Sequence, residues 1–206
     1  MLTNLLSVIT TWVISVISTF GYPGVFLLMA MHSAAIPVPS EVVMPFAGFL
    51  VSQGRFNYLA VVIVGTLGNL AGGSAIYFLA KHGGRKLVEK YEHAVFVSKG
   101  DLDRVERFFH RFGAYAIFLG RCMPIVATFI SIPAGLSKIK YWKFAVSTFF
   151  GAIIWNFLLT YIGMKLGQNW TSLRDKFHNF ELAILVLILI GAGLWIYRHI
   201  KNRVKA

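Results

Sequence analysis

Long apolar stretches, separated by short polar segments, run along most of this chain. The stretch at about 57–80 carries no charge and is long enough to cross a bilayer as a helix, which takes about 20 residues. Similar patterns predict spanning helices at about 142–165 and 180–199, whereas 5–20 is short for a span. Within the first of these helices, Gly68 and Gly72 form a pair of small residues that allows a neighbouring helix to approach closely.

Two further apolar stretches, at about 25–51 and 113–136, are broken by prolines. These prolines are Pro37, Pro39 and Pro45 in the first stretch, and Pro124 and Pro133 in the second. Broken backbone at membrane depth is tolerated only where protein buries it or water reaches it. Each stretch therefore predicts a re-entrant hairpin that enters and leaves on one face, and in the first a half-helix is expected to begin near Ser40.

The two predicted hairpins end alike. The first contains Pro45-Phe-Ala-Gly48 and the second Pro133-Ala-Gly135, each before a turn and a spanning helix. Two broken elements entering from opposite faces are typical of inverted-repeat transporters. The pattern predicts an all-α integral membrane protein, one domain over residues 1–206, with spanning helices and two opposed re-entrant hairpins in an inverted repeat.

The charge of the chain is strongly basic, with a net charge of +12, although 57% of its residues are hydrophobic. Basic residues cluster at 81–111, at 138–143 and in the tail after residue 197. If the second hairpin is re-entrant, the positive-inside rule places all three clusters, and the C-terminus, in the cytoplasm. This distribution favours anionic lipid headgroups as partners over nucleic acid.

The segment 101–112, inside the first basic cluster, has apolar residues at helical spacing. They are Leu102, Val105, Phe108, Phe109 and Phe112. This spacing predicts an amphipathic helix along the membrane surface, with Ser98 as a candidate N-cap.

Two charges stand alone in the broken apolar stretches. Glu41 is the only acidic residue before Glu89, and Arg121 is the only Lys, Arg, Asp or Glu between Arg111 and Lys138. A charge at bilayer depth costs roughly 2.5–3.5 kcal/mol on insertion scales, so such residues usually have a function. Glu41 is a candidate proton carrier, or else a charge that satisfies a helix N-terminus. Arg121 suits a phosphate, or else forms a buried ion pair with Glu41.

The remaining polar residues suggest little further chemistry. His32 is either a packing residue or a group that titrates near neutral pH. Asn69 and Asn156 lie inside predicted spanning helices and need partners there. No histidine has metal-ligand spacing, and no nucleophile–base pattern is visible, so we expect no metal, no cofactor and no enzyme activity.

The broken stretches resemble those of a known family. Pro37-Val-Pro39-Ser40-Glu41-Val-Val-Met-Pro45-Phe-Ala-Gly48 and Gly120-Arg121-Cys-Met-Pro124 with Ile130-Ser-Ile-Pro133-Ala-Gly135 are similar to the DedA family, also called the VTT or SNARE-associated domain family. The resemblance implies a multi-pass bacterial inner-membrane protein with two opposed re-entrant hairpins. It also implies translocation of lipids such as undecaprenyl phosphate or phosphatidylethanolamine, and a link to the proton motive force.

Two positions depart from the pattern of that family. His32 stands where the family usually carries an acidic residue, and Ala127 stands where it usually carries a second arginine. The missing arginine weakens the expectation of undecaprenyl phosphate in particular more than that of lipid transport.

The expected function is a proton-coupled lipid flippase in which Arg121 binds the phosphate and Glu41 and His32 carry protons. A proton-coupled transporter of small cations or drugs is the alternative, and a membrane enzyme fits least well. Self-association into a homo-oligomer is left open by the sequence.

Overall fold

The computed structural model describes residues 2–36, 38–84, 99–123 and 126–167, and every regular element in these ranges is helical. Contacts divide the chain into two units, Met1–Gly167 and Gln168–Ala206. The predicted helix at 180–199 and the basic tail lie outside the described residues. The helices are α1 (Leu2–Phe20), α2 (Tyr22–Ser33), α3 (Ser40–Ser52), α4 (Tyr58–Leu79), η1 (Ala80–Gly84), α7 (Lys99–Arg121), α8 (Val126–Phe129), α9 (Ser131–Leu136) and α10 (Tyr141–Leu166).

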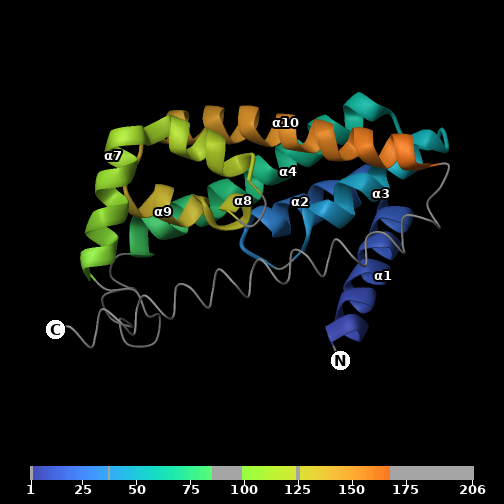
Figure 1. The fold of residues 1–206 in the computed structure, drawn as a ribbon, viewed down its shortest axis with the longest axis horizontal. Coiled ribbons are helices and arrows are strands. Elements are labelled where there is room, and N and C mark those ends of the chain that lie inside the picture. Colours follow the sequence, from blue (N-terminus) through green and yellow to red (C-terminus); the bar gives the residue numbers. More distant parts are fainter. Residues whose placement is uncertain (1, 37, 85–98, 124–125, 168–206) are drawn as a thin grey trace. The chain divides into compact units, whose positions relative to one another are not determined.

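Helices α4 and α10 run antiparallel along the length of the first unit (Figure 1). At the start of α4, the hydroxyl of Tyr58 donates a hydrogen bond of 2.8 Å to the carbonyl of Phe157, near the end of α10. At the other end of the pair, the rings of Tyr77 and Phe144 stack with centroids 4.7 Å apart. By length and composition, α4 with η1 and α10 are both long and apolar enough to cross a membrane.

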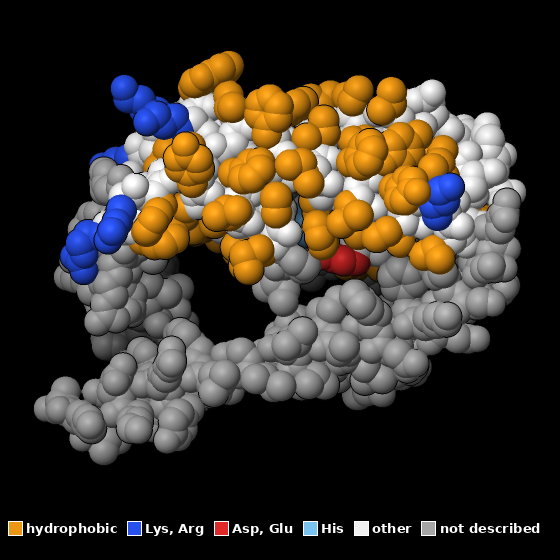
Figure 2. Space-filling model, turned by 45° about the horizontal axis from the view of Figure 1, so that its top comes forward, with side chains coloured by type: hydrophobic (Ala, Val, Ile, Leu, Met, Phe, Trp, Pro, Cys, Tyr) orange, Lys and Arg blue, Asp and Glu red, His pale blue; other side chains and the backbone are white. Residues whose placement is uncertain are grey.

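The surface of this helix pair is apolar in the middle and basic at both ends. Figure 2 shows hydrophobic side chains across the described face, with Lys and Arg only near its ends. The exposed apolar side chains include Leu59, Ile63, Leu67, Phe150, Ile154 and Phe157. Arg55 and Lys165 flank one end of the pair, and Lys81, Lys138, Lys140 and Lys143 flank the other. This is the distribution expected of a protein whose middle faces lipid and whose ends face water.

Two sets of shorter helices pack against this pair from opposite ends (Figure 1). In the first set, α2 packs on α4 and α3 packs on α10. In the second set the partners are exchanged. Its first helix, α7, packs on α10, and its return helix, α9, packs on α4. The two sets also meet each other, through contacts between α2 and α8.

Glycines bring these helices into backbone contact. A Cβ atom at Gly68 would lie 2.5 Å from the carbonyl oxygen of Phe26, and one at Gly72 would overlap the carbonyl of Ala30. Both carbonyls belong to α2, so the close approach predicted for this glycine pair is confirmed. The contact between α3 and α10 uses a second pair, since a Cβ at Gly48 would overlap the carbonyl of Thr160, and a Cβ at Gly163 would overlap that of Pro45.

Helix α7 joins the predicted surface helix to the first arm of the second hairpin. The two parts meet at Gly113, whose φ of 46° and ψ of −117° break the helical path. This backbone conformation suits glycine, because other residues rarely adopt a positive φ. On the first part, Phe109 is buried in a cluster with Tyr77 and Phe144, while Phe108 is exposed. The candidate N-cap, Ser98, lies outside the described residues.

The return arm of the second set is shorter than its counterpart. It consists of α8 and α9, with 4 and 6 residues, whereas α3 has 13. Pro133 lies early in α9, where a residue needs no hydrogen bond from its own backbone N–H. Because proline lacks this N–H, Pro133 cannot bond to a carbonyl in the turn before it.

Candidate functional site

The first helix of the site is α3, which begins at Ser40 as predicted. Pro39 occupies its N-cap position, with an extended backbone and no side-chain cap. The N–H groups of Val42 and Val43 both reach the carbonyl of Pro39, at 3.1 and 3.2 Å. Glu41 lies in the first turn, where the positive end of the helix dipole stabilises a carboxylate. Its side chain is half-buried.

Pro45 does not end this helix, although the sequence analysis treated it as an interruption. It lies inside α3, and the helix continues to Ser52. Because proline has no N–H, it cannot bond to the carbonyl four residues before it, which is that of Glu41. The break in the first hairpin is therefore the segment between α2 and α3, around Pro39, rather than Pro45.

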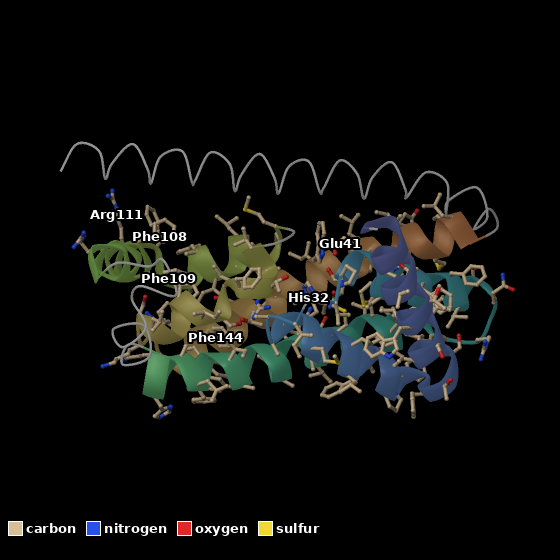
Figure 3. All side chains as sticks on the ribbon, turned by 90° about the horizontal axis from the view of Figure 1, so that it is seen from below. His32, Glu41, Phe108, Phe109, Arg111 and Phe144 are labelled. Atoms are coloured by element: carbon tan, nitrogen blue, oxygen red, sulfur yellow. The ribbon has the colours of Figure 1, made fainter. Side chains whose placement is uncertain are left out.

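His32 ties that segment to the end of α2. Its side chain is only 6% exposed, and Nδ1 lies 2.8 Å from the carbonyl oxygen of Val38. Since a carbonyl can only accept, Nδ1 carries the proton of this hydrogen bond. The next residue, Ser33, accepts a hydrogen bond from Arg121, and Val38 lies three residues before Glu41, so His32 lies between the two predicted charges. Figure 3 labels His32 on α2 and Glu41 on α3.

Arg121 is the most deeply buried charge among the described residues, with 2% of its surface exposed. It lies in the last turn of α7, where the negative end of the helix dipole favours a cation. Nη1 donates to the hydroxyl of Ser33 at 2.5 Å and to the carbonyl of Ala127 at 3.0 Å. Nη2 donates to the hydroxyl of Ser131 at 2.8 Å. Nε is buried and has no hydrogen-bond partner in the part of the chain that the structure describes.

These partners bear on the two interpretations offered for Arg121. In the described part of the chain, the guanidinium is held by two hydroxyls and a carbonyl, and no carboxylate pairs with it. The buried ion pair with Glu41 is therefore not formed in this structure. Each charge is instead stabilised by the end of its own helix.

Two glycines make room for the arginine. A Cβ atom at Gly73 of α4 would lie 2.5 Å from Nη2 of Arg121 and 3.1 Å from the hydroxyls of Ser33 and Ser131. A Cβ atom at Gly151 of α10 would lie 2.6 Å from the Cβ of Arg121. We refer to Ser33, Ser131, the Ala127 carbonyl, Gly73 and Gly151 as the arginine cage.

No pattern in the sequence marks the residues of the arginine cage as functional. Serines in apolar helices usually bond to their own backbone, so nothing singles out Ser33 or Ser131 before the hairpins are placed. The available signals were the adjacency of Ser33 to His32 and the second glycine in the Gly72-Gly73 pair. Ala127 has a role that its side chain could not reveal, because its carbonyl accepts from Arg121.

Several buried polar atoms around the site have no partner among the described residues. They are Ser40 Oγ, Asn69 Oδ1, Thr148 Oγ1 and Asn156 Oδ1, in addition to Arg121 Nε. Asn156 has one of the hydrogen-bond partners that it was predicted to need, since its Nδ2 donates to Oγ1 of Thr66 at 3.2 Å. Unpartnered buried polar atoms are unfavourable by about 1–3 kcal/mol each. In native proteins such atoms usually meet an ordered water, an ion or a ligand.

Comparison with known proteins identifies the family of the chain. Residues 38–165 match the VTT domain. An uncharacterized membrane protein of Bacillus subtilis, YkoX, is 34% identical over 96% of this chain and 86% of its own length. Undecaprenyl phosphate transporter A of the same species is 30% identical, over 93% of both chains. No solved structure matches the chain significantly.

A third relative has a name of another kind. An alkaline phosphatase-like protein of Lactococcus lactis is 32% identical, over 89% of this chain and 90% of its own. The absence of an enzyme activity therefore stays a prediction.

The domain match covers more than half of the chain, and these relatives match it over most of their length. Their descriptions place them in bacterial membranes or name them as transporters. The chain therefore belongs to the DedA family of bacterial membrane proteins, which carry the VTT domain.

Proposed function

We propose that this protein is a flippase that moves a phosphate-bearing lipid across the bacterial inner membrane. The candidate lipids are undecaprenyl phosphate and phospholipids such as phosphatidylethanolamine. Arg121 holds the phosphate, and Glu41 and His32 carry the coupled protons. The observation that supports this most directly is a buried guanidinium that, within the described residues, has no carboxylate partner and leaves Nε without a hydrogen bond. The name of one relative, undecaprenyl phosphate transporter A, supports the same substrate class.

The architecture that we propose is an inverted repeat of two re-entrant hairpins, 25–51 and 113–136, each followed by a spanning helix. Its support is the exchanged order in which the two sets of short helices meet α4 and α10. The lengths agree, because α2 and α3 have 12 and 13 residues and a bilayer span needs about 20.

The arginine cage suggests how a lipid phosphate would enter. Ser33 belongs to the first hairpin and Ser131 to the second, and both hold the same guanidinium. A phosphate offers charged acceptor oxygens, which bind arginine more strongly than neutral hydroxyls do. We infer that separation of the hairpin tips from one side releases Nη1 and Nη2 to the phosphate. Closure then restores the two serine contacts.

The alternative, a carrier of small cations or drugs, would use Glu41 as its binding group. The charge of Arg121 acts on the same His32 ring as that of Glu41, and a buried cation at this place disfavours a second one. Reconstitution in liposomes separates the two functions. We expect movement of labelled polyprenyl phosphate or phosphatidylethanolamine, and cation uptake without lipid movement would contradict the proposal.

The Glu41→Gln variant should insert and fold normally but lose most of its transport. Glutamine keeps the size of the side chain and removes the group that takes up a proton. The measurement is the rate of lipid movement in liposomes with and without a pH gradient. A rate and a pH dependence equal to those of the original protein would remove Glu41 from the mechanism.

The proposed orientation can be tested with single cysteines after replacement of Cys122, the only natural cysteine. We expect cysteines at Arg107 and Lys138 to react with an impermeant reagent from the cytoplasmic side, and cysteines at Arg55 and Lys165 from the outside. All four native side chains are exposed. Labelling of positions 107 and 138 from opposite faces would mean that 113–136 crosses the bilayer.

A further inference from the structure

The N-terminus of α3 has properties that Arg121 alone does not explain. Ser40 lies in its first turn, is 1% exposed, and its hydroxyl has no hydrogen-bond partner among the described residues. No side chain caps this terminus. The N–H groups of Val42 and Val43 bond to the Pro39 carbonyl, so those of Ser40 and Glu41 are the ones left outside the bonding of the helix itself, at the end where the dipole favours an anion.

A second unpartnered donor belongs to the same region. Arg121 Nε is buried and meets no acceptor from residues 2–36, 38–84, 99–123 and 126–167, while its two terminal nitrogens are held in the arginine cage. Arg121 is joined to the first hairpin through Ser33, which directly follows His32. His32 in turn bonds through Nδ1 to the carbonyl of Val38, two residues before Ser40. The α3 terminus and the arginine therefore belong to one electrostatic site.

Glu41 is the obstacle to an anion in this site. Its carboxylate lies in the same first turn, so an ionised Glu41 already supplies the negative charge that the helix end favours. A phosphate and an ionised carboxylate would repel each other there, in a region of low dielectric constant. Protonation of Glu41 removes that repulsion and frees the helix end.

We propose that the N-terminus of α3, with the Ser40 hydroxyl, and the Nε side of Arg121 form one phosphate seat. Ionised Glu41 keeps a phosphate out of this seat, so the lipid phosphate binds together with a proton. This inference rests on the proposed function and adds the second half of its binding site. It also supplies, from the backbone, positive potential that a second arginine at position 127 would otherwise provide. Protons and lipid then travel in the same direction.

Few titratable or charged groups other than Glu41 come from the helices around it and could cause this pH dependence. His32 comes from α2 and Arg121 from α7. Helices α1 and α8 contain no charged or titratable residue. The charged residues of α10, Lys143 and Lys165, lie near its two ends, and α4 contributes only the tyrosines Tyr58 and Tyr77.

The test measures binding of a short-chain polyprenyl phosphate to the purified full-length protein in detergent, by calorimetry, between pH 5 and pH 8. The Glu41→Gln variant should bind well across this range, apart from the protonation of the probe itself. The original protein should bind more weakly at high pH. The ratio of the two dissociation constants should therefore grow with pH, by up to about tenfold per unit if one proton is taken up with each ligand. A ratio independent of pH would overturn the coupling.

Ser40→Ala tests the seat itself. Loss of a hydroxyl donor to a charged phosphate should weaken binding by about tenfold at every pH while the pH dependence is retained. The stability of the folded protein should not fall, because the variant removes a buried hydroxyl that has no partner among the described residues. The matched control is Ser52→Ala, at the other end of α3, where the hydroxyl bonds to the Phe49 carbonyl. Binding by Ser40→Ala equal to that of the control would overturn the seat.

The outcomes also separate this inference from the proposed function. If the original protein binds no phosphate probe at any pH, including short-chain phosphatidylethanolamine and inorganic phosphate, the proposed function fails as well. If the lipid phosphates bind and Ser40→Ala has no effect, only the seat on α3 is wrong. Binding of inorganic phosphate as strongly as the lipid phosphates would show that the seat recognises the headgroup alone.

Discussion

A single methyl group at Gly73 is expected to destabilise the folded protein by about 3 kcal/mol and to abolish transport, since hydrogen bonds to a charged group contribute roughly 1.5–3 kcal/mol each. The Gly73→Ala side chain would occupy the place of Nη2 of Arg121, and it would also crowd Ser33 and Ser131. The guanidinium must then move away from its acceptors in a site where no carboxylate replaces them. Thermal denaturation in detergent measures the loss of stability, and the liposome assay measures transport.

The matched control is Ala71→Leu on the same helix. Ala71 is exposed, so the larger side chain extends into lipid, and its effect should stay within about 0.5 kcal/mol. If Gly73→Ala is as stable and active as this control, the arginine cage is not as tight as the structure describes.

Arg121→Lys should fold and insert, yet transport lipid at least about tenfold more slowly, as expected from the loss of one hydrogen bond to a charge. Lysine keeps the charge but presents it at one point, whereas the guanidinium reaches Ser33 and Ser131 with two separate nitrogens. Lysine also has no N–H donor in the position of Nε. Since no ion pair with Glu41 is formed in this structure, the charge alone should not be sufficient.

The control for this variant is Arg55→Lys, the same change at an exposed arginine in the turn before α4. It should leave both binding of short-chain polyprenyl phosphate and transport unchanged. Binding and transport by Arg121→Lys equal to this control would reduce Arg121 to a structural cation, and the phosphate role would have to be abandoned.

The parts of the fold that could be predicted from the sequence depend on local rules. Length and composition indicate α4 and α10, and Pro39 indicates the start of α3, because proline restricts the residues around it. The burial of Arg121 was also predictable, since a lone charge in an apolar stretch must be taken out of lipid. The local effect of Pro45 was misjudged, because a proline in the first turns of a helix removes one bond without ending the helix.

The arginine cage could not be predicted, because it depends on the register between two hairpins. Ser33 and Ser131 come together only once α2 and α9 are placed beside the end of α7. The bond from His32 to Val38 is likewise a matter of loop geometry. Sequence reasoning located both charges and offered a pair between them as the alternative to phosphate binding. In this structure, helix ends and neutral acceptors stabilise each charge separately.

The glycines of this protein differ in whether a second mutation elsewhere could restore function after the glycine has been replaced. A side chain at Gly65 or Gly120 would meet the side chains of Met44 or Ile130, and a second substitution can shorten those. A side chain at Gly48 or Gly163 would meet a main-chain carbonyl, which every amino acid carries. Genetic selections should therefore recover intragenic revertants of the first kind readily. For the second kind, only restoration of glycine itself is expected.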